Sequence, residues 1–269
     1  MKIILSRKGY DSSYGGGASP IMPNGDLISI PIPSVNNEIG TAYSEINYGT
    51  KSYLELMKEL GLKIPKDEDC HFDPDLIQNA VKREPNWTGI FGQNGYALSH
   101  LEKTPLEEGD LFLFFGSFKR TYHKKTLKFE RDNERHIIFG YLIIDKIMNP
   151  HDDPENVIYN SHPHFKNADH YKNSNTVYIA KDENGYGTFK YRDELVLTRE
   201  GYSKSQWELP MIFHPKNGTQ ISRHSDKNIE TREDKMLLNS VGIGHDFVIE
   251  GNPEIEKWAK DLITHSEKI

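Results

Sequence analysis

Cysteine and long apolar runs are scarce in this chain of 269 residues. The single cysteine, Cys70, excludes an intrachain disulfide and a cysteine metal cluster. No apolar stretch approaches the length of a membrane span, and the apolar run at residues 3–5 is too short for a signal peptide. We therefore expect a cytoplasmic protein with no membrane partner, in a reducing compartment.

Positive charge is also in deficit. Lysine and arginine number 33 against 40 acidic residues, which gives a formal net charge of -7. This balance excludes a whole-surface affinity for nucleic acid, so any such contact must come from a local basic patch. The hydrophobic fraction of 36% and aromatic fraction of 11% are typical of a globular chain with a sizeable core. With no internal repeat, we expect a single domain over residues 1–269.

Apolar runs punctuated by turn residues predict most of the strands. The runs at 111–116 and 137–145 are continuous, which is typical of strands covered on both faces. The long polar segment between them predicts an antiparallel pair. Further strands are expected at 3–5, 27–30, 176–180, 186–190, 194–197 and 246–249, with helices at 52–60, 75–82, 93–103, 232–239 and 253–264. Irregular interleaving of helices and strands predicts an α+β fold with a mixed or mainly antiparallel sheet flanked by helices.

The N-terminal strand is followed by a loop that combines cations, hydroxyls and glycines. Glycine allows close approach of the backbone to a ligand, and neighbouring cations favour a phosphate. The loop matches neither the P-loop pattern nor G-x-G-x-x-G. A tight glycine turn joining two strands is an equally good interpretation. The candidate phosphate contacts are Arg7, Lys8, Ser12, Ser13, Gly15, Gly16 and Gly17.

A basic segment with interspersed aromatic residues lies between the two long strands. Residues 117–136 hold seven lysines and arginines against three carboxylates. Cations contact phosphates and aromatic faces stack on bases, so this loop suits a nucleotide or a DNA strand. Lys119 and Arg120 are its candidate phosphate contacts. The alternative is a solvated hairpin loop.

Two histidines at a spacing of two, His162 and His164, share a face if the chain is extended there. Imidazoles so placed could act as acid and base, could bind a divalent metal, or could be structural. No HExxH pattern accompanies them, so we assign no metal ligands. Asp110, which follows Gly109, is either a catalytic carboxylate or the cap of a turn.

Several blocks together resemble the third nucleotide-modification-associated domain family. They are LSRKGYDSS at 5–13 with glycines 15–16, FGQNGYA at 91–97, GDLFLFFG at 109–116, HPH at 162–164, NTVYIA at 175–180, LVLT at 195–198 and SQWELP at 205–210. The resemblance implies a bacterial or phage protein linked to altered nucleotides or DNA bases, and it supplies no catalytic residues. The chain departs from the family pattern at Asn94 and Tyr96, where small residues are expected.

A second likeness is architectural and covers residues 104–148. A Gly-Asp turn, an apolar strand, a long loop and a second strand resemble the small β-barrels of pseudouridine-synthase-and-archaeosine-type domains. This likeness implies a small β-barrel within the α+β fold.

These observations favour a protein that binds a phosphorylated nucleotide and modifies it or its base. Gln93 and Asn94 would hydrogen-bond a base edge through their amides, and Asp110, His162 and His164 would supply acid–base chemistry. No cofactor and no oligomeric state is assigned. The alternatives are a reader that binds modified bases or nucleotides without changing them, and an accessory subunit of a DNA-modification system.

Overall fold

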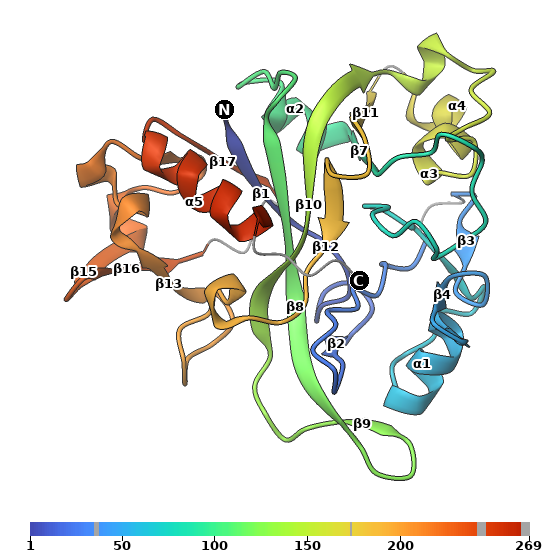
Figure 1. Cartoon of the computed structure of the whole chain (residues 1–269), viewed down its shortest axis with the longest axis horizontal. Coiled ribbons are helices and arrows are strands. Elements are labelled where there is room, and N and C mark those ends of the chain that lie inside the picture. The colour runs from blue at the N-terminus through green and yellow to red at the C-terminus, as the bar shows by residue number, and fades with distance from the viewer. Residues whose placement is uncertain (35–37, 173, 241–245, 265–269) are drawn as a thin grey trace.

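The apolar runs of the sequence pair into one large mixed sheet (Figure 1). The structure, a computed structural model, describes residues 1–34, 38–172, 174–240 and 246–264. The strands of the large sheet are β1 (Ile3–Arg7), β2 (Ser19–Ile21), β7 (Ile90–Asn94), β8 (Leu111–His123), β9 (Leu127–Phe129), β10 (Arg135–Met148), β11 (Asn175–Ala180), β12 (Tyr186–Thr188), β14 (Gln220–Ile221) and β17 (Asp246–Glu250). Their order is β14-β17-β1-β8-β10-β11-β7, with β2 and β9 paired to β8 and β12 paired to β10.

Smaller sheets and short helices surround this sheet. The remaining strands are β3 (Thr41–Ala42) paired with β6 (Asp69–Cys70), β4 (Asn47–Tyr48) paired with β5 (Lys51–Ser52), and the trio β13 (Gln206–Pro210), β16 (Lys235–Asn239) and β15 (Ile229–Arg232). The helices are α1 (Tyr53–Leu60), α2 (Gly95–Leu101), α3 (Pro163–Lys166), α4 (Ala168–Tyr171) and α5 (Pro253–Thr264). This arrangement confirms the α+β prediction. Among the described helices, none has the length and apolar character needed to cross a membrane.

The predicted antiparallel pair forms the centre of the core. Strands β8 and β10 pair in antiparallel register, with Phe112 opposite Leu142 and Phe115 opposite Ile138, and these four side chains are buried. Strand β1 lies parallel to β8 on its other side. The chain leaves β1 at Lys8, whose backbone N–H donates to Phe115 O over 2.8 Å. The core sheet therefore fixes where the N-terminal cations lie.

The predicted β-barrel is not formed. The large sheet ends in β14 on one side and β7 on the other, and no pairing joins these two strands among the described residues. Within residues 104–148 of that open sheet, β8 pairs with β10 and, at its far end, with β9. Residues 111–118 of β8 are all buried by other parts of the chain, so closure of the sheet on itself is not needed to bury them.

Helix α1 shows how well local signals predict an element. Ser52 caps its first turn: the hydroxyl accepts from Glu55 N, and the Glu55 carboxylate accepts from Ser52 N. Gly61 ends the helix with φ of 66°, a conformation that glycine adopts without strain. The predicted helix at 52–60 is thus confirmed to within one residue.

Two predicted helices are absent. Residues 232–239 mostly form the strand β16, in which Met236 and Leu238 are buried and their neighbours are more exposed, the alternation typical of a strand. Residues 75–82 form turns, and Asp75 N and O exchange hydrogen bonds with Ile90 O and N at the edge of β7. In both segments, hydrogen bonds to strands elsewhere in the chain determine the structure that forms.

Three further segments differ from the prediction. Residues 93–94 finish strand β7, and the helix expected at 93–103 begins only at Gly95. Residues 194–197 form a 3-10 turn and a single bridge to Ile137 in place of a strand. The strand expected at 27–30 is reduced to a bridge between Leu27 and Ile21. The first difference matters for the site, because it places the Gln93 side chain on the sheet.

Candidate functional site

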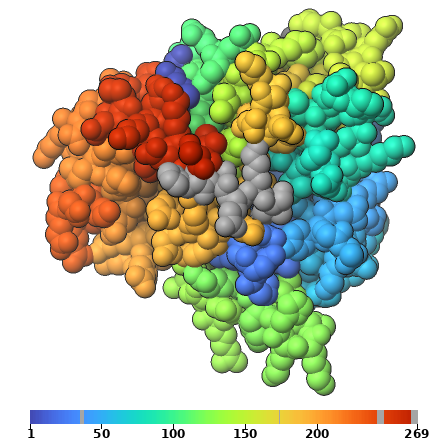
Figure 2. Space-filling view, in the orientation of Figure 1, coloured from blue at the N-terminus to red at the C-terminus, as the bar shows by residue number. Residues whose placement is uncertain are grey.

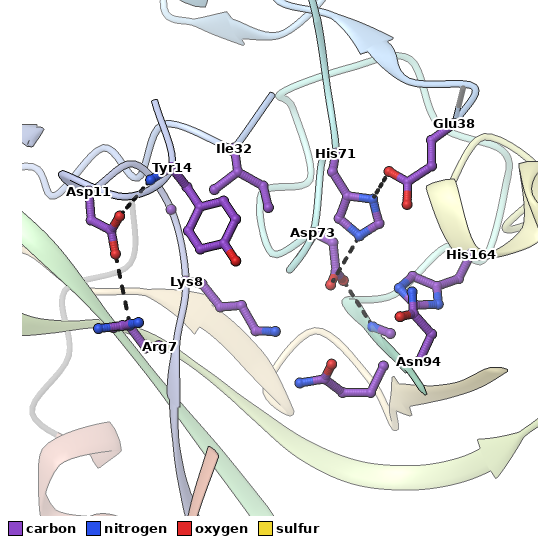
Figure 3. A pocket seen from close by; sticks show the side chains of 13 residues that line it. Arg7, Lys8, Asp11, Tyr14, Ile32, Glu38, His71, Asp73, Asn94 and His164 are labelled. Carbon is purple, nitrogen blue, oxygen red and sulfur yellow. Dashed lines mark hydrogen bonds and ion pairs between the residues drawn. The ribbon is translucent and has the colours of Figure 1, made fainter. Parts of the chain in front are cut away.

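A cavity of about 210 Å³ opens where β1 and β7 end, and the segment 71–73 and helix α3 lie on its opposite side (Figure 3). The sequence predicted five of the residues that line it: Arg7, Lys8, Gln93, Asn94 and His164. The lining also includes Gly9, Asp11, Tyr14, Ile32, Glu38, His71, Asp73 and Gly92.

Two cations form one wall. Arg7 Nε lies 3.9 Å from Asp11 Oδ2, so a carboxylate fixes this guanidinium (Figure 3). Lys8 extends into the cavity, and its Nζ lies 4.4 Å from the centre of the Phe91 ring. Among the described residues the Lys8 ammonium forms no ion pair with a carboxylate. A cation held on an aromatic face is available to an anionic ligand.

Two residues of the glycine loop, Asp11 and Tyr14, line the cavity. Its three consecutive glycines do not. Asp11 is buried, and its Oδ1 accepts from Ser13 N (2.7 Å) and Tyr14 N (2.8 Å). These amides therefore point at Asp11 and are not presented to a ligand. The residues of the predicted cradle that lie outside the cavity lining are Ser12, Ser13, Gly15, Gly16 and Gly17.

Gly15 has a structural reason to be glycine. Its φ is +95°, and a Cβ there would lie 2.4 Å from the Tyr10 ring. The turn thus packs tightly on a buried tyrosine. This packing matches the alternative interpretation, in which the glycines form a tight turn between two strands. Tyr14 projects from this turn towards the cavity with its hydroxyl group facing Lys8 and Asp73 (Figure 3).

Histidines and a carboxylate form the facing wall. His71 Nε2 lies 3.8 Å from Asp73 Oδ2, and His162 Nε2 lies 3.1 Å from Asp73 Oδ1. The rings of His71 and His164 are 5.3 Å apart between centroids. His164 is 1% exposed and lines the cavity, whereas His162 caps helix α3 and lies behind Asp73. The two predicted histidines therefore differ in role.

The charges on this wall depend on burial and on the neighbouring groups. Burial alone would raise the pKa of Asp73, but the hydrogen bond from His162 and the positive charges nearby, including Lys8, lower it to about 2. Burial lowers the pKa of His164 to about 3, and the opposing effect of Asp73 does not compensate. At neutral pH the wall therefore holds an anionic Asp73 beside a neutral His164.

Gln93 is held by a buried carboxylate. Its Nε2 donates to Asp246 Oδ2 over 2.8 Å, and Ser6 Oγ donates to Asp246 Oδ1 over 2.6 Å. One N–H of the Gln93 amide is thereby engaged, which leaves the second N–H and the carbonyl oxygen as the groups that can meet a ligand. Asn94 makes no side-chain cap bond to helix α2 and lines the cavity.

Asp110 lies outside this cavity and acts as the cap of a turn. Its carboxylate accepts from Lys2 N over 2.7 Å and from Glu107 N over 2.9 Å. Both oxygens therefore satisfy backbone groups where β1 and β8 begin. This geometry matches the alternative in which Asp110 caps a turn, and we leave Asp110 out of the proposed site.

Lys119 and Arg120 also lie away from the cavity. They sit on β8 opposite β2, and the Arg120 guanidinium packs over the Tyr191 ring at 4.5 Å. Beyond them β8 and β9 form an arm that stands out from the body of the molecule, at the bottom of Figures 1 and 2. The basic segment is therefore a separate surface.

Three residues of the cavity lining were not predicted as site residues: His71, Asp73 and their partner Glu38. The first two follow β6 with the same spacing of two that was noticed at His162 and His164. Attention to that H-x-D spacing could have found them. Glu38 has no such signal, because its role depends on a contact with His71 Nδ1 at 3.3 Å.

The edge of the open α+β sheet thus brings cations, histidines and carboxylates together in one cavity. Residues 2–250 match the family described as nucleotide modification associated domain 3, and the chain belongs to that family. No curated protein and no solved structure matched the chain.

Proposed function

We propose that the cavity binds a nucleotide through its phosphate and that the protein modifies this nucleotide or its base. The observation that carries the proposal is the placement of Lys8 and Arg7 on one wall and His164 with Asp73 on the other. Membership in the family supports a role associated with nucleotide modification.

Each wall has a distinct task. A phosphate would contact Lys8 and Arg7, since cations bind phosphate oxygens through charge-assisted hydrogen bonds. Tyr14 offers an exposed ring for stacking on a base, and Gln93 offers a carbonyl oxygen to an amino group of the base. His164 is neutral at neutral pH, so its ring can accept a hydrogen bond from a group bound beside it.

Binding can be tested by calorimetric titration of deoxynucleoside mono- and triphosphates, with and without divalent ions. A hydrogen bond to a charged group contributes about 1.5–3 kcal/mol, so Lys8→Ala is expected to weaken binding by about tenfold or more. The matched control is Lys257→Ala, a lysine exposed on α5 and outside the cavity lining. Equal affinity of both variants and the wild type would refute the phosphate site.

Modification can be tested by incubating the protein with nucleotides and with DNA and following mass changes. A covalent change that is lost in His164→Ala supports an enzyme. Tight binding without any mass change, across several classes of donor, would favour the alternative of a reader.

A specific observation favours DNA as a second ligand of the same protein. The β8–β9 arm exposes Tyr122 with Lys124, Lys125 and Lys128 (Figure 2). Exposed cations next to an aromatic face suit a nucleic-acid strand. Changing the three lysines to glutamate is expected to weaken DNA binding and flatten its salt dependence, while mononucleotide binding in the cavity stays unchanged. Unaltered DNA binding would exclude the arm.

A further inference from the structure

We propose that His71, Asp73 and His164 bind a divalent transition-metal ion on the wall of the cavity. One ligand atom from each residue lies within 4.8 Å of the other two. Ligands about 2.1 Å from a tetrahedral ion lie about 3.4 Å apart. The 3.8 Å between His71 Nε2 and Asp73 Oδ2 is close to that value, so small side-chain movements complete the site.

The hydrogen bonds of His164 leave one nitrogen for a metal. His164 Nδ1 lies 2.6 Å from Asn175 Oδ1, and Asn175 Nδ2 donates to His164 O. The amide nitrogen is thus accounted for, so Oδ1 must accept and His164 Nδ1 must carry the proton. In the neutral ring, Nε2 then bears the free electron pair that a metal requires.

His71 is oriented in the same way by a carboxylate. Its Nδ1 lies 3.3 Å from Glu38 Oε2, and its Nε2 is turned towards Asp73 (Figure 3). A carboxylate only accepts hydrogen bonds, so Nδ1 is the protonated nitrogen. A histidine whose far nitrogen donates to a carboxylate is the usual arrangement behind a metal ligand.

Asp73 presents one oxygen and has the other engaged. Its Oδ1 accepts from Gly92 N over 2.9 Å and from His162 Nε2 over 3.1 Å. Two donors on Oδ1 leave Oδ2 as the oxygen that faces His71. Each of the three ligands therefore has an outer partner that fixes its orientation.

Gly92 allows the third ligand to approach. A Cβ at this position would lie 2.2 Å from His164 Cδ2 and 2.6 Å from His164 Nε2. Only glycine on β7 lets the imidazole lie against the strand while the same residue's N–H donates to Asp73. The sheet edge is thus shaped around both ligands.

The donor set indicates the class of ion. Two imidazole nitrogens and one carboxylate oxygen suit Zn²⁺, Fe²⁺ or Co²⁺, whereas Mg²⁺ and Ca²⁺ prefer oxygen ligands alone. Three protein ligands leave coordination positions open, and they face the cavity that Lys8 lines. The inference goes beyond the proposed function, because metal binding does not require a nucleotide.

The test titrates the metal-free full chain with Zn²⁺ by calorimetry and with Co²⁺ by visible absorption, without nucleotide. We expect one ion per chain, with Co²⁺ bands typical of nitrogen and oxygen ligands. His71→Ala and His164→Ala are expected to weaken binding by about a hundredfold or more, and Glu38→Gln by about tenfold or more, in line with first and outer ligand shells. Circular dichroism of the metal-free variants checks that they fold.

The matched control is His151→Ala. His151 lies 3.7 Å from Asp169 on the exposed surface and outside the cavity lining, so its loss should leave metal binding unchanged. Wild-type protein that binds no ion, or that binds as weakly as His71→Ala, would overturn the metal site. Nucleotide affinity of Lys8→Ala, measured separately, still decides the proposed function.

Discussion

A buried histidine next to the core makes stability depend strongly on pH. His136 is 4% exposed, and Trp207 Nε1 donates to its Nδ1 over 3.1 Å. Burial, with smaller contributions from the charges of Arg7 and Lys204, lowers the pKa of His136 to about 3. A protonated ring would face the indole N–H with a second donor, so the folded protein excludes the charged form.

The magnitude follows from the difference between the folded and unfolded pKa values. An unfolded histidine has a pKa of about 6.5, so between pH 6.5 and 3 the unfolded chain binds the extra proton and stability falls as pH falls. Each pH unit costs about 1.4 kcal/mol. At pH 4.5 His136 alone should therefore lower the free energy of unfolding by about 3 kcal/mol relative to neutral pH.

The assay compares urea unfolding of wild type and His136→Gln at pH 7.5 and 4.5. Glutamine keeps an acceptor for Trp207 Nε1 but does not titrate. The stability advantage of the wild type over the variant should therefore shrink by about 3 kcal/mol at the lower pH. Other buried histidines titrate in both proteins and cancel. Equal losses of stability in the two proteins would refute the reasoning.

Three further changes have defined outcomes. Gly92→Ala should push His164 away from β7, because the new Cβ would lie 2.2 Å from the ring, and a weaker Co²⁺ absorption would report it; an unchanged spectrum would contradict the close packing. Arg83→Met should destabilise the protein by about 3–5 kcal/mol in urea unfolding, because Arg83 NH1 and NH2 hold the buried Asp75 at 2.6 and 2.5 Å; a loss near zero would mean that Asp75 is neutral in the fold. Ser52→Ala should cost about 1 kcal/mol through loss of the α1 cap, measured by thermal unfolding, and no change would show that packing alone holds the helix.

The sequence predicted the parts of the fold that depend on local patterns. Two continuous apolar runs identified β8 and β10, and the capping signals around Ser52 and Gly61 identified α1. The same kind of pattern gave the wrong prediction at residues 232–239, where a helix was expected and a strand forms. A short run with two buried positions fits a helix or a strand equally well. Only its pairing with β13 and β15 decides it.

The site was predictable only where its residues stand together in the chain. Arg7 and Lys8 follow an obvious strand, so their position at the end of a sheet could be inferred. Asp73 is oriented by a contact with His162, which is 89 residues away in the chain. Contacts at that separation depend on how β7 and β11 pair, which no local spacing shows.

The charges of the cavity link the two proposals. Apart from its histidines, the lining holds the cations Arg7 and Lys8 against the carboxylates of Asp11, Glu38 and Asp73. An anionic phosphate would enter a lining with an excess of negative charge, which opposes binding. A divalent ion between His71, Asp73 and His164 reverses that balance and offers the phosphate a direct ligand. Metal and nucleotide should therefore raise each other's affinity by the same factor, as binding linkage requires.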